Sequence, residues 1–124
     1  MISRHFSRAE MACSCGCGLD TMDVETLKIA DECRDFAGHS ITPSSAARCM
    51  DHNRAIRSKD DSQHVKCRAL DLPVREPKEL YKFLCNRYPN QYGFGLYNSF
   101  VHVDTKSGGA RRWEVSAANG TKTS

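Results

Sequence analysis

Apolar residues recur at steps of three and four between residues 20 and 37, which predicts the clearest helix of the chain. Acidic residues crowd its first turns and Gly38 follows its last one, and both features are typical of helix ends. A second helix is predicted over 77–87, where Pro77 suits the first turn. A short third helix is predicted over 51–57. The apolar positions of the first helix are Val24, Leu27, Ala30, Cys33 and Ala37.

The last third of the chain has short β-prone segments at 92–96, 100–104 and 112–115, separated by polar and glycine-rich turns. This pattern predicts a meander of antiparallel strands. Two more short strands are expected at 41–45 and 69–72. Because helices come first and strands later, we expect an α+β fold in which a small antiparallel β-sheet packs with two or three helices.

The remaining segments are expected to be irregular. Residues 1–19 are rich in cysteine and glycine and are interpreted as a loop, as is the polar segment 58–63. The small, polar residues 116–124 predict a disordered tail. With no internal repeat, the whole of 1–124 is expected to form one domain.

Composition restricts the possible partners. Hydrophobic residues make up 40% of the chain and charged residues 27%, which is typical of globular proteins. No run approaches the roughly 20 apolar residues that span a bilayer, so we expect no membrane insertion. The net charge of +3 is too weak and scattered to indicate nucleic-acid binding. We therefore expect no nucleic-acid partner, and separately we expect a monomer. The N-terminus lacks the apolar core of an export signal, so the protein is expected to stay in the cytoplasm where it is made.

Two pairs of residues suggest metal chemistry. His64 precedes Asp71 by seven residues, and His102 and Asp104 share one face of the segment 100–104 because side chains alternate along a strand. Two histidines and an aspartate suit zinc, and three protein ligands leave a fourth position for water, as in catalytic sites. Each of these residue pairs alone is weak evidence for a metal site, because a single histidine in a strand is more often a core or surface residue.

Several short motifs occur along the chain in this order: Phe6-Ser7, Cys13-x-Cys15-Gly16-Cys17-Gly18, Ser45-Ala46-Ala47-Arg48-Cys49, Asp51-His52-Asn53, Ser62-Gln63-His64 with Ala69 and Asp71, and Phe100-Val101-His102-Val103-Asp104. Their order resembles the M15 family of zinc peptidases, in its small phage and prophage branch. The metal-site pattern is also similar to that of the D-Ala-D-Ala carboxypeptidases and the hedgehog signalling domain, and the resemblance spans about residues 6–113.

The resemblance implies a hedgehog and D-Ala-D-Ala-peptidase-like fold and one zinc ion per chain, held by His64, Asp71 and His102. It also implies that the metal activates a water molecule and that Arg48 contacts the substrate. These roles agree with general chemistry, since zinc lowers the pKa of its water and a guanidinium can hold a carboxylate or an oxyanion. The alternative for Arg48 is a surface salt bridge.

The general base is not evident. Many relatives carry an acid or a histidine where this chain has Ser99 and Phe100. Asp104 is the remaining candidate for a catalytic role, and it could orient water, act as the base or brace a metal ligand. The chain departs from the phage pattern at two more positions, with Cys67 where glycine is usual and Ala46 within the Ser-Gly-Tyr-Arg-like run.

These features predict a zinc metallopeptidase that cuts peptidoglycan stem peptides as a carboxypeptidase or endopeptidase. The resemblance suggests a phage or prophage endolysin that acts from the host cytoplasm on the cell wall after release. Two alternatives remain open. A non-catalytic zinc-binding module for wall recognition or phage structure is favoured by Ser99, and a thiol redox protein is suggested only by the cysteine count.

The seven cysteines allow one further expectation. Cys13, Cys15 and Cys17 could hold a structural metal with Cys33, but spacing by one residue argues against a shared tetrahedral ion and favours reduced thiols. Cys49 and Cys67 lie beside the expected metal site in sequence and could bind metal opportunistically. Trp113 is expected to anchor the last strand in the core rather than to stack on a sugar.

Overall fold

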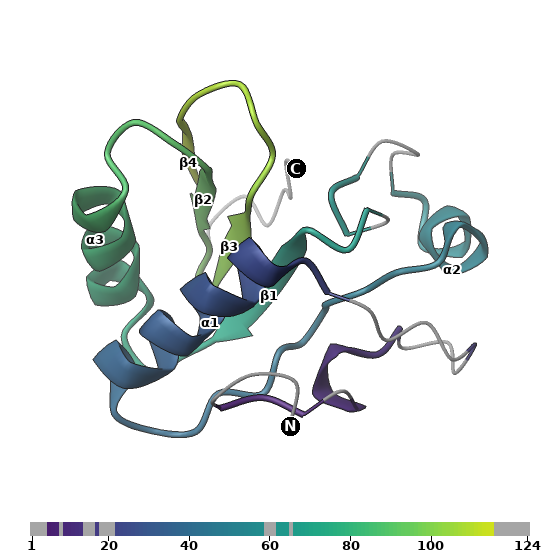
Figure 1. The fold of residues 1–124 in the computed structure, drawn as a ribbon, viewed down its shortest axis with the longest axis horizontal. Coiled ribbons are helices and arrows are strands. Elements are labelled where there is room, and N and C mark those ends of the chain that lie inside the picture. Colours follow the sequence, from purple (N-terminus) through teal and green to yellow (C-terminus); the bar gives the residue numbers. More distant parts are fainter. Residues whose placement is uncertain are drawn as a thin grey trace.

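A four-stranded mixed sheet forms the centre of the computed structural model, which describes residues 5–7, 9–13, 17, 22–58, 62–64 and 66–115 (Figure 1). The strand order is β1-β3-β2-β4. β3 runs antiparallel to both β1 and β2, whereas β4 runs parallel to β2. The strands are β1 (Ala69–Pro73), β2 (Gly93–Leu96), β3 (Phe100–Asp104) and β4 (Arg111–Glu114).

The α+β class is confirmed, but the expectation of a purely antiparallel sheet is wrong for β4. Both edges of β3 are already occupied by β1 and β2, so β4 can pair only at an outer edge of the sheet, and it pairs with β2. The connection 105–110 stays at the end of the sheet where β3 finishes and β2 begins. β4 therefore starts opposite Gly93 and runs in the same direction as β2.

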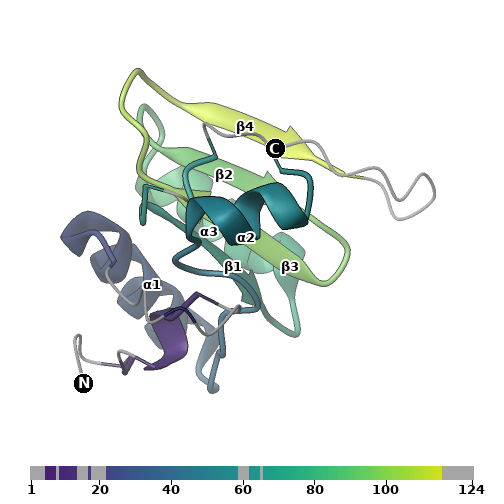
Figure 2. The ribbon, with the colours of Figure 1, turned by 90° about the vertical axis from the view of Figure 1, so that its right-hand side faces the viewer.

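Two longer helices support the sheet. In α1 (Val24–Ala37), the Asp23 side chain accepts a hydrogen bond from the Thr26 main-chain N–H, and Gly38 ends the helix with a φ of 70°. α3 (Pro77–Arg87) begins at the proline expected there and packs against β2 and β3. The short α2 (Met50–Ala55) lies on the opposite side of the sheet from α3 (Figures 1 and 2).

Alternation along β1 and β3 gives the sheet two chemically different faces. Leu70 and Leu72 of β1 and Val101 and Val103 of β3 are fully buried in the hydrophobic core, together with leucines of α3. The residues between them, including Asp71 and the histidine of β3, therefore point to the other face. The shared face expected for the polar residues of 100–104 is confirmed.

Residues 44–49, here called the strap, do not belong to a strand as 41–45 was expected to. Their only β contact among the described residues is an isolated bridge between Ser45 and Asp71. Pro43 has no N–H to donate, and the chain leaves β1 after this single bridge. The strap then leads directly into α2.

The N-terminal segment contributes to the core instead of forming only an irregular loop. Residues Ala9–Met11 form the 3-10 helix η1, and both Phe6 and Met11 are fully buried. The expected tail 116–124 and residues 59–61 of the loop 58–63 lie outside the described residues, as do residues 20 and 21 of the first expected helix. No helix among the described residues is long and apolar enough to cross a membrane.

Candidate metal centre

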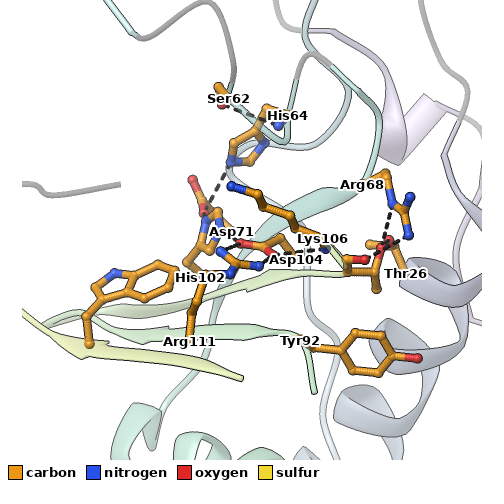
Figure 3. A network of polar contacts seen from close by, with 12 residues as sticks. Thr26, Ser62, His64, Arg68, Asp71, Tyr92, His102, Asp104, Lys106 and Arg111 are labelled. Carbon is orange, nitrogen blue, oxygen red and sulfur yellow. Dashed lines mark hydrogen bonds and ion pairs between the residues drawn. The ribbon is translucent and has the colours of Figure 1, made fainter. Parts of the chain in front are cut away.

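His64, Asp71 and His102 meet on the polar face of the sheet (Figure 3). Asp71 and His102 face each other directly in the β1–β3 register, and their Oδ1 and Nδ1 atoms are 2.8 Å apart. His64 Nε2 lies 3.5 Å from the same Asp71 oxygen. One possible ligand atom from each residue lies within 4.8 Å of the others, and all three side chains are buried. The structure thus brings together the three residues expected to bind metal.

His64 comes from the turn that precedes β1, not from a strand. Its Nδ1 is 2.8 Å from the carbonyl oxygen of Ala46 in the strap, so this nitrogen must donate. In the neutral imidazole, Nε2 then carries the lone pair and faces Asp71. A carbonyl that fixes the tautomer in this way is the usual companion of a histidine that binds a metal.

His102 is held from behind by Asp104. The His102 Nε2 lies 2.9 Å from Asp104 Oδ2, on the opposite side of the ring from Asp71. Asp104 also accepts hydrogen bonds from the Arg111 guanidinium through both oxygens and from the Lys106 main-chain N–H. Burial acts to raise the pKa of Asp104, but the bonds from His102 and Arg111 outweigh it and hold that pKa below its ordinary value.

The carboxylates of this cluster stabilise a positive charge at His102. Burial alone would raise the pKa of Asp71, but hydrogen bonds from His102 and His64 hold it well below its usual range. Burial alone would lower the pKa of His102, yet Asp104 and Asp71 raise it. A divalent cation supplies such a charge, and two imidazoles with one carboxylate are donors that zinc accepts. The residues therefore fit the metal that the resemblance implies.

Arg48 is buried, not part of a surface salt bridge, and its guanidinium supports the strap. It donates to Ser45 Oγ at 2.9 Å, to Asn53 Oδ1 at 3.0 Å and to Ser58 Oγ at 3.3 Å. The Arg48 main-chain N–H also donates to the His64 carbonyl at 3.1 Å. Burial lowers the pKa of Arg48 and the charge of Asp71 acts against this, which shows that the guanidinium is near the cluster. Arg48 thus connects the strap, α2 and the turn that carries His64.

The position of Asp104 distinguishes among the roles left open for it. Its oxygens contact the far nitrogen of His102 and Arg111, not the atoms that converge between His64 and Asp71. Bracing of His102 is the role that this arrangement favours. Ser99 is exposed in the turn between β2 and β3.

Two groups at the site were not expected from the sequence, and a third, Trp113, was expected in the core but lies outside the core cluster. The role of the Ala46 carbonyl could not be predicted from sequence, because every residue has a main-chain carbonyl. Nothing in the sequence marked Arg111 as a partner of Asp104, seven residues before it. The Trp113 indole lies over Gly95, where an added Cβ would be only 2.3 Å from its Nε1, and its ring centre is 5.3 Å from that of His102. Trp113 is half-buried and forms a wall beside His102.

Cysteines form a second cluster, but not with the members considered from sequence. Cys33 is fully buried in the core on α1, where burial raises the pKa of its thiol, so it does not join the others. Cys13 and Cys17 instead approach Cys49 of the strap. Cys15 lies outside the described residues. The thiol of Cys13 also raises the pKa of Cys67, after the larger effect of burial, so Cys67 is near this cluster.

Comparison with known proteins gives one match. A family model described as Peptidase M15 matches residues 4–104, which include the strap, all three residues of the metal centre and Asp104. No curated protein and no solved structure matches the chain. Because the family model covers well over half of the sequence, the chain belongs to the M15 peptidase family.

Proposed function

We propose that the protein is a zinc metallopeptidase that hydrolyses amide bonds in peptidoglycan stem peptides. The observation that carries this proposal is the convergence of His64, Asp71 and His102 with the second nitrogen of each imidazole already engaged. This arrangement aims one nitrogen of each ring and one carboxylate oxygen at a common point. The peptidase family supports the reaction class, and the resemblance to the phage branch supports the substrate.

Zinc held by these three residues supplies Lewis-acid chemistry, which lowers the pKa of a water molecule and polarises a peptide carbonyl. The protein keeps the ligands in the required state. Asp71 remains a carboxylate because its pKa is held low, and the Ala46 carbonyl keeps the proton of His64 on Nδ1. Asp104 holds the ring of His102 in place.

For Arg48 we propose a positioning role as its main contribution. Its guanidinium already donates to three side chains, and direct contact with a substrate carboxylate would require some of these bonds to open. Its guanidinium bonds Ser45 and its main-chain N–H bonds the His64 carbonyl, so Arg48 ties the strap to the turn. The substrate contact expected from the resemblance would then depend on this support.

The biological setting is proposed from the resemblance. A phage or prophage endolysin would accumulate in the host cytoplasm and reach the cell wall after release. The small positive net charge would not oppose approach to an anionic wall polymer. Either carboxypeptidase or endopeptidase action agrees with the residues at the metal centre.

A non-catalytic zinc-binding module is the second candidate. It is favoured by the hydrogen bonds that commit both oxygens of Asp104 to Arg111, His102 and the Lys106 main chain. A carboxylate engaged in this way is poorly placed to take a proton from water. Such a module would bind wall fragments without cutting them.

Mass spectrometry of the soluble products from purified peptidoglycan tests the proposal. Zinc-loaded protein is compared with His64→Ala and with His39→Ala, a matched control at a histidine outside the cluster. We expect new peptide fragments with wild-type protein and His39→Ala but not with His64→Ala, and the fragment masses identify the bond. If folded, zinc-loaded wild-type protein binds several wall types without releasing fragments, the enzyme is excluded and the binding module is supported.

A further inference from the structure

A cluster of three thiols joins the N-terminal segment to the strap. The Sγ atoms of Cys13, Cys17 and Cys49 all lie within 4.8 Å of one another, and those of Cys13 and Cys49 are 3.8 Å apart. Cys13 is buried, Cys49 is half-buried and Cys17 is exposed. The cluster is therefore anchored inside the molecule and open to solvent on one side.

The spacing suits a metal better than a covalent bond between sulfurs. Zinc–sulfur bonds of about 2.3 Å in a tetrahedron place neighbouring sulfurs about 3.8 Å apart. The Cys13–Cys49 separation has this value, whereas a disulfide would need the two atoms within about 2.05 Å. The structure records no disulfide between any two of the cysteines that it describes.

A positively charged side chain and a main-chain donor lie beside the cluster. The Arg48 guanidinium interacts electrostatically with the Cys13 thiol, and a nearby positive charge stabilises the deprotonated form of a cysteine. The Cys49 main-chain N–H points to Cys13 Sγ at 3.4 Å. Three thiolates this close would repel one another without a cation between them, and soft thiolates select zinc over calcium or magnesium.

We propose that Cys13, Cys17 and Cys49 bind a second metal ion, a structural zinc with a non-cysteine ligand such as water in its fourth position. This site shares no ligand with the centre formed by His64, Asp71 and His102. It fastens the N-terminal segment onto the strap, beside the hydrogen bond from the Ala47 main-chain N–H to the Met11 carbonyl.

Because it is bound to the strap, this zinc would also affect the position of His64 in the other metal centre. The strap carries the Ala46 carbonyl that fixes His64 and the Arg48 guanidinium that fixes the strap itself. A cross-link at Cys49 holds the next residue after Arg48 against the N-terminal segment. Loss of this zinc should therefore loosen the turn that carries His64 without removing any of its ligands.

Cobalt(II) substitution tests the proposal, because thiolate ligands give an intense charge-transfer absorption in the near ultraviolet that imidazole and carboxylate ligands do not. The full-length, reduced protein is titrated with cobalt, and bound metal is counted by elemental analysis. Wild-type protein should bind two equivalents and show the thiolate absorption. His64→Ala should lose one equivalent and keep the absorption.

Cysteine variants decide whether the three named thiols are responsible. Cys17→Ser changes an exposed residue and should fold normally, and it should lose the thiolate absorption together with one equivalent of cobalt. Cys49→Ser should do the same, whereas Cys85→Ser on α3 serves as the matched control and should behave as wild type.

Absence of the absorption in reduced wild-type protein would overturn the proposal. It would also be overturned if the absorption survived Cys17→Ser and Cys49→Ser, or if Cys13 and Cys49 formed a disulfide in protein purified with zinc.

The experiments distinguish an error in the proposed thiol zinc site from an error in the proposed peptidase activity. The absorption reports thiolate binding whether or not peptidoglycan is cut. Peptide fragments in the wall assay depend on His64 and would still appear if the cysteines bound no metal.

Discussion

The two histidines of the metal centre are held by different kinds of structure. His102 lies on β3, which has a paired strand on each side, and its far nitrogen contacts Asp104, which is itself bound by Arg111. His64 lies in a turn, and its far nitrogen contacts a main-chain carbonyl of the strap. One side of the centre is therefore built by the sheet and the other by irregular segments.

This difference determines what each side depends on. The position of His102 opposite Asp71 follows from strand register, and a one-residue slip of either strand would turn its metal-binding side chain to the apolar face. The position of His64 depends on contacts among the turn, the strap and α2, in which Arg48 takes part. We expect damage on the sheet side to reduce stability most, and damage on the strap side to act more on the metal centre than on the core.

The largest effect is expected from Asp104→Asn on the sheet side. Asp104 is buried and paired with Arg111, and breaking a buried ion pair typically reduces the free energy of unfolding by 3–5 kcal/mol. Because the Arg111 side chain is 35% exposed, we expect the low end, about 3 kcal/mol. Zinc affinity should also fall about tenfold or more, since His102 loses its brace. Urea unfolding of metal-free protein and zinc competition with a chelator measure the two effects.

The double variant Asp104→Asn with Arg111→Gln provides the control for that experiment. Removing both charges should destabilise the protein by less than the sum of the two single changes, because the partners interact directly. Unchanged zinc affinity in Asp104→Asn would contradict the bracing role assigned to Asp104.

A smaller loss of stability is expected from Arg48→Met on the strap side. The change removes a buried charged donor and its hydrogen bonds to the oxygens of Asn53 and Ser45, which should lower the free energy of unfolding by about 2 kcal/mol. If Arg48 positions the strap, zinc affinity should fall and kcat should drop more than KM rises. Arg75→Met, at an exposed arginine, is the matched control. A rise in KM alone, with stability and zinc affinity intact, would show that Arg48 serves only as a substrate contact.

The sequence predicted the parts of the fold that depend on local pattern. The helix that begins at Pro77 and the strand Phe100–Asp104 have the bounds expected from periodicity and end signals. The pairing of β4 with β2 could not be predicted, because it depends on which sheet edges remain available. Residues 41–45 were mistaken for a strand, because their pattern does not show that only Ser45 pairs with β1.

In the candidate site, too, local pattern predicted some contacts, whereas contacts between distant parts of the sequence were not predicted by it. His102 and Asp104 share a face by simple alternation, so local sequence sufficed, whereas the grouping of His64 with Asp71 came from a resemblance to known motifs. Cys33 was considered as a partner of the N-terminal cysteines and disfavoured on spacing alone, and the structure buries it in the core on α1. Cys49 joins Cys13 across 36 residues, and neither spacing nor periodicity reports such a contact.

The smallest effect is expected at Cys67, in the turn between His64 and β1. Cys67 has a φ of 58°, a left-handed conformation that disfavours any residue with a Cβ by roughly 1–2 kcal/mol. Cys67→Gly relieves this strain but gives the unfolded chain more freedom, so we expect a net gain of about 0.5–1 kcal/mol in the free energy of unfolding. Urea unfolding measures it, with Cys67→Ala as the control that removes the thiol and keeps the Cβ. An equal gain in Cys67→Ala would assign the effect to the thiol and refute the backbone explanation. A gain only in Cys67→Gly would show that the irregular side of the centre carries strain that the chain tolerates beside His64.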